Sequence, residues 1–283
     1  DYPDCYFQVF TNGTLLDDDT AARMRQLGNV TPLISVEGDA DVSDDRRGGD
    51  RVYQRSMAGI DACRRHGLVT GVATSVCRSN QAYVQSDAFL QTLVDHGVHY
   101  VWYYIYRPAG PRPTPELALD ADGITDLRRF LVDARLRWPL MIVDAYWDAD
   151  GRGLCPAAMG ISHHVNPKGM VEPCPPIQFA RDSLADADDP VACLAESQFL
   201  ERFRALAART TRGCILLENP RDLLEFVRHE DASDTSGRDT AHAELEARRA
   251  LPGHDQPDAA VPERSRLYRF LKKNWFFGFG AYG

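Results

Sequence analysis

The sequence predicts an α/β protein built on a parallel sheet, and two observations lead to this prediction. First, four apolar segments near the start of the chain lack clean polar alternation, as is typical of parallel strands covered on both faces. Second, amphipathic segments separate them, which gives the alternation of βα units with right-handed crossovers. The four predicted strands lie at residues 5–10, 31–36, 68–76 and 99–106.

Three helices are predicted between these strands. In the second of them, Tyr53, Met57 and Ile60 recur at spacings of three and four residues, which places them on one apolar stripe. The second and third helices each end in a His-Gly pair, where glycine stops the helix and histidine meets the negative end of the helix dipole. The predicted helices cover about residues 17–27, 50–65 and 83–95.

Length, charge and hydropathy limit the number of domains and argue against nucleic-acid binding and a membrane-spanning helix. The 283 residues suffice for one large domain or two ordinary ones. A formal net charge of −9 argues against nucleic acid as a partner, because phosphate binding draws on clustered Lys and Arg. No apolar run reaches the roughly 18 residues of a membrane-spanning helix. We therefore expect a cytoplasmic protein with no transmembrane segment.

The start of the chain reads as a fragment. Asp1 stands where a methionine is usual, and the first strand begins within four residues. We therefore expect an N-terminally truncated chain, for which the absence of a signal peptide is uninformative.

Polar or glycine-containing loops follow all four predicted strands. Parallel sheets carry their chemistry at the carboxyl ends of the strands, so these loops are the candidate ligand-binding edge. They read TNGT, EGD, CRSN and RPAG, at residues 11–14, 37–39, 77–80 and 107–110.

The second half of the chain changes character after a Pro-rich connector. A helix at about 121–137 and the strand-like LMIVDAYWD lead into a region with four cysteines, a predicted hairpin and a helix near 195–208. A charged, Ala-rich and Asp-rich stretch then predicts a mostly disordered linker, with a short helix around AHAELEARRA. The predicted divisions are a parallel-sheet domain at 1–115, a connecting helix and strand at 116–150, a Cys-rich α+β domain at 151–228, the linker at 229–263 and a basic aromatic tail at 264–283.

The tail carries five basic residues between Arg264 and Lys273, interleaved with apolar ones. Such a helix can bind a membrane surface or a partner groove. We favour the alternative, a terminal helix docked on the core. The final GFGAYG matches a dinucleotide-binding pattern, but no strand precedes it and no helix follows, so we set that interpretation aside.

Four segments together, FTNGT, ISVEGD, DRRGGDRVYQRSMAGI and HHVNPKGMVEPC, resemble the radical S-adenosylmethionine (radical SAM) superfamily. The resemblance covers about residues 5–225 and is closer to members with a cysteine-rich SPASM or twitch extension. It implies a partial (β/α)6 barrel, with about four visible βα units, followed by a small Cys-rich α+β domain.

The resemblance also implies a cofactor site at the strand ends. In the family, polar groups there hold the methionine and ribose parts of S-adenosylmethionine. The matching positions are Thr11, Asn12, Gly13, Ser35 and Glu37, with Arg47 and Asn80 as further candidates.

One family feature is absent from these 283 residues. The Cys-x3-Cys-x2-Cys loop that holds the S-adenosylmethionine-cleaving [4Fe-4S] cluster does not occur in the sequence. If CYFQVFTNGT corresponds to the third family strand, two βα units and that cluster precede this chain. We therefore expect the chain alone to be inactive.

The late cysteines suggest a metal site. Thirteen residues separate Cys155 from Gly169 and four separate Gly169 from Cys174, and a turn at Gly169 can bring the two thiols to one end of a hairpin. The resemblance implies one auxiliary [4Fe-4S] cluster, with Cys193 and Cys214 as the remaining ligands.

Two other interpretations of these cysteines remain open. Zinc also accepts four thiolates or a Cys/His mixture, with His163 and His164 nearby in sequence. The third interpretation is four buried thiols without metal. The earlier Cys5, Cys63 and Cys77 are predicted to be small core residues.

The function implied by the resemblance is that of a radical SAM oxidoreductase or maturase. Such an enzyme forms a 5′-deoxyadenosyl radical that abstracts hydrogen from a peptide, protein or small-molecule substrate, and it needs an electron donor. Aromatic residues on the last strand, Trp102, Tyr103, Tyr104 and Tyr106, are candidates to line the cavity. The alternative is a non-catalytic binding module, with a zinc or iron–sulfur knuckle on a degenerate barrel.

Overall fold

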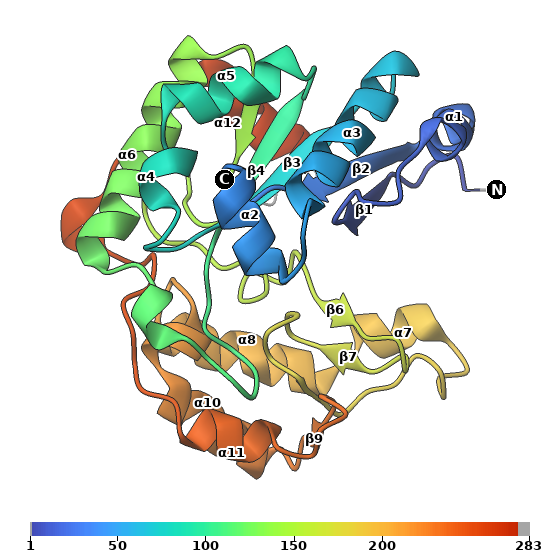
Figure 1. The fold of residues 1–283 in the computed structure, drawn as a ribbon. Coiled ribbons are helices and arrows are strands. Elements are labelled where there is room, and N and C mark those ends of the chain that lie inside the picture. Colours follow the sequence, from blue (N-terminus) through green and yellow to red (C-terminus); the bar gives the residue numbers. More distant parts are fainter. Residues whose placement is uncertain (1, 277–283) are drawn as a thin grey trace. The chain divides into compact units, whose positions relative to one another are not determined.

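The computed structural model describes residues 2–276, which form two units (Figure 1). Unit 1 comprises the chain up to Tyr106 together with Asp126–Asp144, and unit 2 comprises Arg107–Thr125 and the chain from Ala145 on. The expected boundaries at 115 and 150 are therefore displaced, because the long helix after the connector groups with the sheet. The GFGAYG pattern and the end of the tail lie outside the described residues.

Unit 1 is a five-stranded parallel sheet in the order β1-β2-β3-β4-β5. The α/β class and all four predicted strands of the first 106 residues are confirmed, and a fifth strand from the LMIVDAYWD segment joins the same sheet. The strands are β1 (Phe7–Thr11), β2 (Val30–Ser35), β3 (Gly71–Val76), β4 (Tyr100–Ile105) and β5 (Met141–Val143).

Helices connect consecutive strands of unit 1 in the βα pattern. The three predicted helices and the one near 121–137 are present, and a further helix, α2, follows β2. Sequence reasoning missed α2 because most of its residues are polar and its only buried residue is Ser43. Asp39 caps its first turn. The helices are α1 (Asp18–Leu27), α2 (Ala40–Arg47), α3 (Val52–Arg65), α4 (Gln81–Val84), α5 (Asp87–Asp95) and α6 (Ala121–Arg137).

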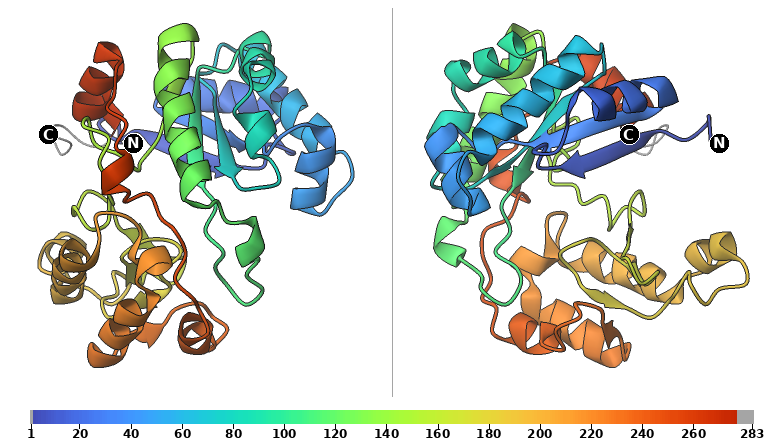
Figure 2. Two further views of the ribbon diagram at one scale, coloured as in Figure 1. Left: turned by 90° about the vertical axis from the view of Figure 1, so that its left-hand side faces the viewer. Right: turned by 45° about the vertical axis from the view of Figure 1, so that its right-hand side comes forward.

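The two faces of the sheet differ in cover. Residues of β4 alternate, with Val101, Tyr103 and Ile105 buried and the residues between them partly exposed. Tyr103 packs against Phe130 of α6 and donates a hydrogen bond to the Val84 carbonyl. The helices thus cover one face (Figure 2). Tyr103 belongs to that face, so it does not line a cavity with its strand neighbours as expected.

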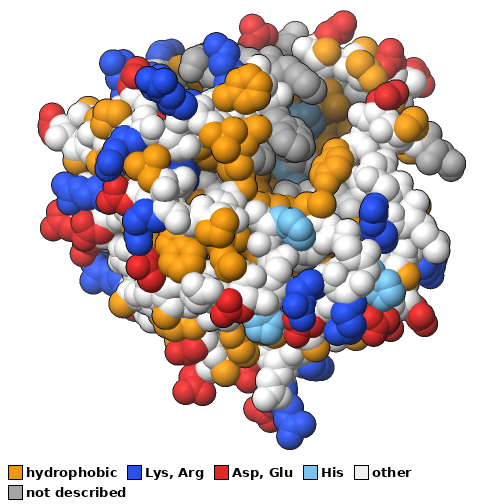
Figure 3. Space-filling model, turned by 90° about the horizontal axis from the view of Figure 1, so that it is seen from above, with side chains coloured by type: hydrophobic (Ala, Val, Ile, Leu, Met, Phe, Trp, Pro, Cys, Tyr) orange, Lys and Arg blue, Asp and Glu red, His pale blue; other side chains and the backbone are white. Residues whose placement is uncertain are grey.

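Strand β1 is an edge of the sheet in the described residues, and it is unusually apolar for an edge. Phe7 is 44% exposed, Val9 is 41% exposed and Phe10 is 59% exposed. Cys5, just before the strand, is also exposed, so its prediction as a core residue is wrong, whereas Cys63 and Cys77 are buried as predicted. Figure 3 shows hydrophobic side chains grouped among charged ones on the surface viewed from above.

Unit 2 is built from short strands and helices around one apolar core. Two antiparallel pairs, β6–β7 and β8–β9, are present, and the hairpin predicted near residue 169 is β6–β7. The strands are β6 (His164–Val165), β7 (Val171–Glu172), β8 (Phe179–Ala180) and β9 (Ser233–Asp234). The helices are α7 (Pro190–Ala195), α8 (Gln198–Thr210), α9 (Ile215–Glu218), α10 (Pro220–His229), α11 (Ala241–Glu246) and α12 (Arg266–Leu271), with the shorter η1 (Pro115–Leu117), η2 (Pro257–Ala259) and η3 (Lys272–Phe276).

The expected disordered linker at 229–263 is wrong. This stretch contains β9, α11 and η2, and its apolar residues Ala232, Ala241 and Leu245 are buried in the core of unit 2. Composition predicted disorder because the stretch has few apolar residues. A few buried side chains are enough to order it, since they pack into a core formed by the rest of unit 2. The short helix expected around AHAELEARRA is α11.

The tail begins as the docked helix favoured from the sequence. In unit 2, Tyr268 of α12 is 2% exposed, and Lys272 donates a hydrogen bond to the Trp147 carbonyl at 2.5 Å. Leu267 and Phe270 remain exposed. In the described part of the chain, no helix combines the length and apolar character needed to cross a membrane.

Candidate functional site

Glu37 is the buried centre of the strand-end loops of unit 1. Its carboxylate accepts hydrogen bonds from the Ser75 backbone N–H at 2.9 Å and from Arg47, and lies 3.7 Å from Nη1 of Arg46. Two guanidinium groups thus compensate a charge that would be costly to bury alone. Glu37 ties the end of β2 to α2 and β3.

Asn80 completes this network from the loop after β3. Its amide donates to the Glu37 carbonyl at 2.7 Å and to the Ser75 carbonyl at 3.0 Å, and its oxygen accepts from the Cys77 N–H at 2.8 Å. The side chain is buried, with all three bonds made to backbone groups. Asn80 and Glu37, 43 residues apart in sequence, are therefore brought together at the carboxyl edge of the sheet.

The loop after β1 is a tight turn held by its own polar residues. Thr11 Oγ1 accepts from the Gly13 N–H at 3.1 Å, and Asn12 Oδ1 accepts from the Thr14 N–H at 3.1 Å. Gly13 has a φ of +73°, and a Cβ there would lie 2.7 Å from Ile34 Cγ2. Only glycine meets both requirements. The Asn12 side chain is exposed.

The face of the sheet opposite the helices offers hydroxyls beside aromatic rings. Ser35 and Trp102 both pair with Ala73, and Tyr104 pairs with Ser75, so their side chains share this face. The Trp102 and Tyr104 rings stack with centroids 5.7 Å apart and planes 9° apart. All of these residues except Ala73 are partly exposed. Hydroxyls next to stacked rings suit a nucleoside, with its sugar hydroxyls and planar base.

Replacing Asn80 with Ala is expected to lower the free energy of unfolding by about 2 kcal/mol, because it leaves the Cys77 N–H and the Glu37 carbonyl buried without this partner. Urea unfolding followed by circular dichroism measures the change. Asn12→Ala is the matched control, since that exposed amide bonds only within its own turn. We expect it to stay within about 0.5 kcal/mol of the parent. Equal losses in both variants would contradict the role assigned to Asn80.

All four late cysteines belong to unit 2, and three of them share one neighbourhood there. Cys214 belongs to the buried apolar cluster, and Cys155 and Cys174 pack against it while keeping part of their surface exposed. Burial raises the pKa of both the Cys155 and the Cys174 thiols, and the neighbouring Cys214 raises them further. The three thiols therefore share one electrostatic environment.

The β6–β7 hairpin positions Cys174. Its turn uses the Asn166 side chain, which accepts from the Lys168 and Met170 N–H groups, and Gly169 with a φ of +80°. A Cβ on Gly169 would lie 2.9 Å from the Ala185 backbone nitrogen, so the turn admits little else. This confirms the hairpin predicted from the Gly-x4-Cys spacing.

Arg107 lies beside the three thiols. Its Cζ lies 5.2 Å from the centroid of the Tyr146 ring, a cation–π distance. Burial lowers the pKa of Arg107, but Tyr146 and the thiols of Cys214, Cys174 and Cys155 raise it, and the net shift is upward. The guanidinium is therefore a permanent positive charge within electrostatic reach of all three cysteines.

The structure does not bring Cys193 to this group. Cys193 lies in α7, where its thiol is 3.9 Å from the Ser183 carbonyl. Burial raises the pKa of this thiol, and Asp182 adds to the shift, whereas none of the other cysteines contributes. Its neighbourhood is thus distinct from that of the other three.

The two histidines in the hairpin segment have other roles. His164 Nδ1 lies 2.7 Å from the buried Glu172 carboxylate, which also accepts from the Asn166 amide. Burial lowers the pKa of His163, and Arg204 lowers it further. His164 is thus a hydrogen-bonded histidine of the hairpin.

The donor set of the three thiols bears on which metal group fits. In the described residues, no three Cys, His, Asp or Glu side chains stand close enough to enclose one metal ion. A tetrahedral zinc site needs sulfur atoms only about 3.8 Å apart, given Zn–S bonds of about 2.3 Å. An iron–sulfur cluster contains several metal ions, so its thiolate ligands stand farther apart. Three thiols sharing one neighbourhood with a cation suit such an anionic cluster.

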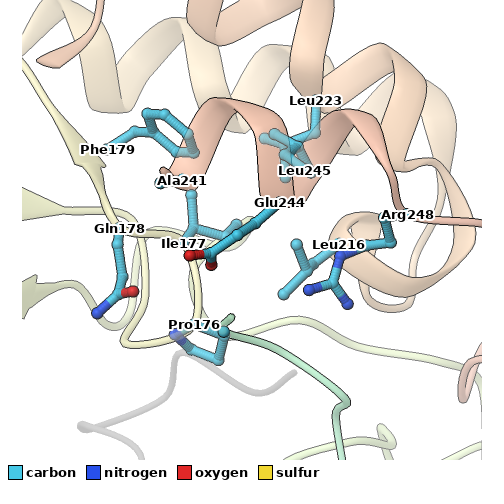
Figure 4. Close-up of a pocket in the computed structure, with 11 residues that line it drawn as sticks. Pro176, Ile177, Gln178, Phe179, Leu216, Leu223, Ala241, Glu244, Leu245 and Arg248 are labelled. Atoms are coloured by element: carbon cyan, nitrogen blue, oxygen red, sulfur yellow. The ribbon is translucent and has the colours of Figure 1, made fainter. Parts of the chain in front are cut away.

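The described residues of unit 2 line a small cavity and a larger one. The smaller, about 30 Å³, is lined by the chain just after Cys174 and by α11, with Ile177, Glu244 and Arg248 among its residues (Figure 4). It has room for little more than water. The larger, about 430 Å³, is lined mostly by prolines and small apolar residues, including Pro108, Pro113 and Leu251. This volume is in the range of small-ligand pockets.

The parallel sheet with its flanking helices has the fold of radical SAM enzymes, which is the fold that the sequence resemblance implies for unit 1. Among solved structures, SuiB of Streptococcus suis matches with a TM-score of 0.55 and 11% identity over 70% of this chain and 50% of that chain. Native anSMEcpe with bound AdoMet matches with a TM-score of 0.54 and 15% identity over 71% of this chain and 59% of that chain.

Among curated proteins, pre-heme d1 synthase of Dinoroseobacter shibae is 28% identical over 145 residues, which are 50% of this chain and 33% of that protein. This chain thus spans about a third of the length of the curated relative. No family model matches the chain. The SPASM extension has no confirmation from these comparisons.

Sequence reasoning missed Arg107 and Arg46 as site residues. Arg107 opens the loop after β4, a position already singled out as a strand end, but nothing in the local sequence links it to cysteines 48 or more residues away. Arg46 neighbours the candidate Arg47, and its Nη1 lies 3.2 Å from the Cys77 sulfur. The strand-end pattern thus covers Arg107 but not Arg46, which lies in α2. The local sequence does not show the partners of either residue.

Proposed function

We propose that this chain is the S-adenosylmethionine-binding and auxiliary-cluster part of a radical SAM oxidoreductase or maturase. The grouping of Cys155, Cys174 and Cys214 beside Arg107 is the observation that carries the proposal. In this proposal the three thiolates hold one auxiliary [4Fe-4S] cluster, and the open sheet face with Ser35, Trp102 and Tyr104 receives the adenosyl group.

Bound S-adenosylmethionine would supply a 5′-deoxyadenosyl radical once a reduced cluster cleaves it. The residues of this chain orient the cofactor: hydroxyl and amide groups at the strand ends meet its ribose and methionine parts, and Glu37 with Asn80 holds those loops in place. The cleaving cluster requires a Cys-x3-Cys-x2-Cys loop supplied by residues outside this sequence, so the chain alone is expected to be inactive.

A peptide is the substrate class with most support. SuiB has been solved bound to its precursor peptide SuiA. The 430 Å³ apolar cavity of unit 2 is large enough for a peptide side chain. A small molecule is the alternative substrate class. The proposed reaction also needs an electron donor, and we propose that it takes place in the cytoplasm.

Anaerobic reconstitution with iron and sulfide tests the cluster directly. We expect about four iron and four sulfide ions per chain, with the visible absorption of an iron–sulfur protein. About one zinc per chain without sulfide would overturn this part of the proposal. It would favour instead the non-catalytic module in which a zinc knuckle binds a partner.

A further inference from the structure

Arg107 has a donor group that the described protein does not satisfy. Its Nε is inaccessible to solvent, and no acceptor among residues 2–276 lies within hydrogen-bonding distance of it. Buried donors in folded proteins nearly always have a partner. An unsatisfied one beside ligand-type side chains indicates an acceptor that the chain itself does not provide.

The surroundings of Arg107 indicate the charge of that acceptor. The face of the guanidinium is engaged by the Tyr146 ring. The groups that otherwise act on it electrostatically are the thiols of Cys155, Cys174 and Cys214. Thiolates with bound sulfide and iron carry net negative charge, and sulfur atoms accept hydrogen bonds. The missing partner is therefore best supplied by an anionic sulfur-containing group.

We propose that Arg107 donates a hydrogen bond to the auxiliary cluster and raises its reduction potential. This inference rests on the cluster assigned above. Reduction adds one electron, and hence one negative charge, to an already anionic group. A fixed positive charge nearby stabilises the reduced form more than the oxidised form, more strongly where water is excluded. Arg107 is thus a residue that tunes the cluster without being its ligand.

The test is an electron paramagnetic resonance redox titration of the reconstituted 283-residue chain. Arg107→Gln and Arg107→Met remove the charge, and Arg107→Lys keeps it. We expect a lower midpoint potential in both neutral variants and a value near that of the parent in the lysine variant. Arg221→Gln, which removes an exposed guanidinium from α10, is the control and should leave the potential unchanged.

Each outcome of the titration either supports or overturns the proposed role of Arg107. Neutral variants that keep their fold but lose the cluster, while the lysine variant retains it, also support a charge that stabilises an anionic group. An unchanged potential in the neutral variants overturns the inference, and so does loss of fold in their metal-free forms, which would assign Arg107 to packing. Failure of the parent chain to form a cluster would overturn the proposed function itself, so the two failures are distinguishable.

Discussion

Replacing Cys174 with Ala is expected to abolish iron and sulfide binding by the reconstituted chain. Cys174 follows the β6–β7 hairpin and packs against the hydrophobic core residues that include Cys214, so its sulfur is placed beside that thiol. Cys155→Ala and Cys214→Ala should have the same effect, because a cluster that loses one of three thiolate ligands is held by too few bonds. Iron and sulfide content per chain is the measurement.

Cys193→Ala is the matched control for these variants. Its thiol lies by Ser183 and Asp182, in a neighbourhood separate from that of the other three. We expect it to bind as much iron as the parent. Loss of iron in Cys193→Ala as well as in Cys174→Ala would contradict the arrangement derived from the structure. It would return the ligand assignment to the four-cysteine set expected from the sequence.

Replacing Asp144 with Asn is expected to destabilise unit 1 by about 3–5 kcal/mol. Asp144 follows β5 and is fully buried, and its carboxylate lies 2.5 Å from Arg135 and 3.4 Å from Arg128, both on α6. The neutral side chain would remove the negative charge that Asp144 places beside two buried guanidinium groups. The loss is measured as the change in the free energy of urea unfolding.

Asp126→Asn provides the comparison on the same helix. Asp126 pairs with Arg129 at 3.2 Å, but both side chains are more than half exposed. Water and salt screen such a pair, so we expect a change within about 0.5 kcal/mol. If the two substitutions lower the free energy of unfolding by the same amount, burial is not the reason why the Asp144 ion pairs stabilise unit 1.

Much of unit 1 could be predicted because its signals are local. Apolar runs, helical stripes such as that of Tyr53, Met57 and Ile60, and glycine helix stops all act within one element. They located three of its helices and all four strands of the first 106 residues. Helix α2 gave no such signal, since Asp39 caps a segment with almost no apolar face. Its stability depends on the loops and helices around it.

The candidate sites could be predicted only in part, because their contacts join segments that are far apart in the sequence. Glu37 and Asn80 were identified as strand-end residues, but their mutual contact and the Arg46–Arg47 pair around Glu37 depend on how neighbouring strands align. The predicted disorder at 229–263 failed because composition does not show which core receives Ala241 and Leu245.

The sequence alone determined the βα alternation, the glycine turn at Gly169 and the pairing of Cys155 with Cys174 as candidate ligands, because each depends on residues close together in the chain. The tertiary structure alone decided that Cys214 joins them, that Cys193 lies apart and that Arg107 stands beside the thiols. These are contacts between distant segments, and they arise only when the core of unit 2 forms and brings those segments to one place.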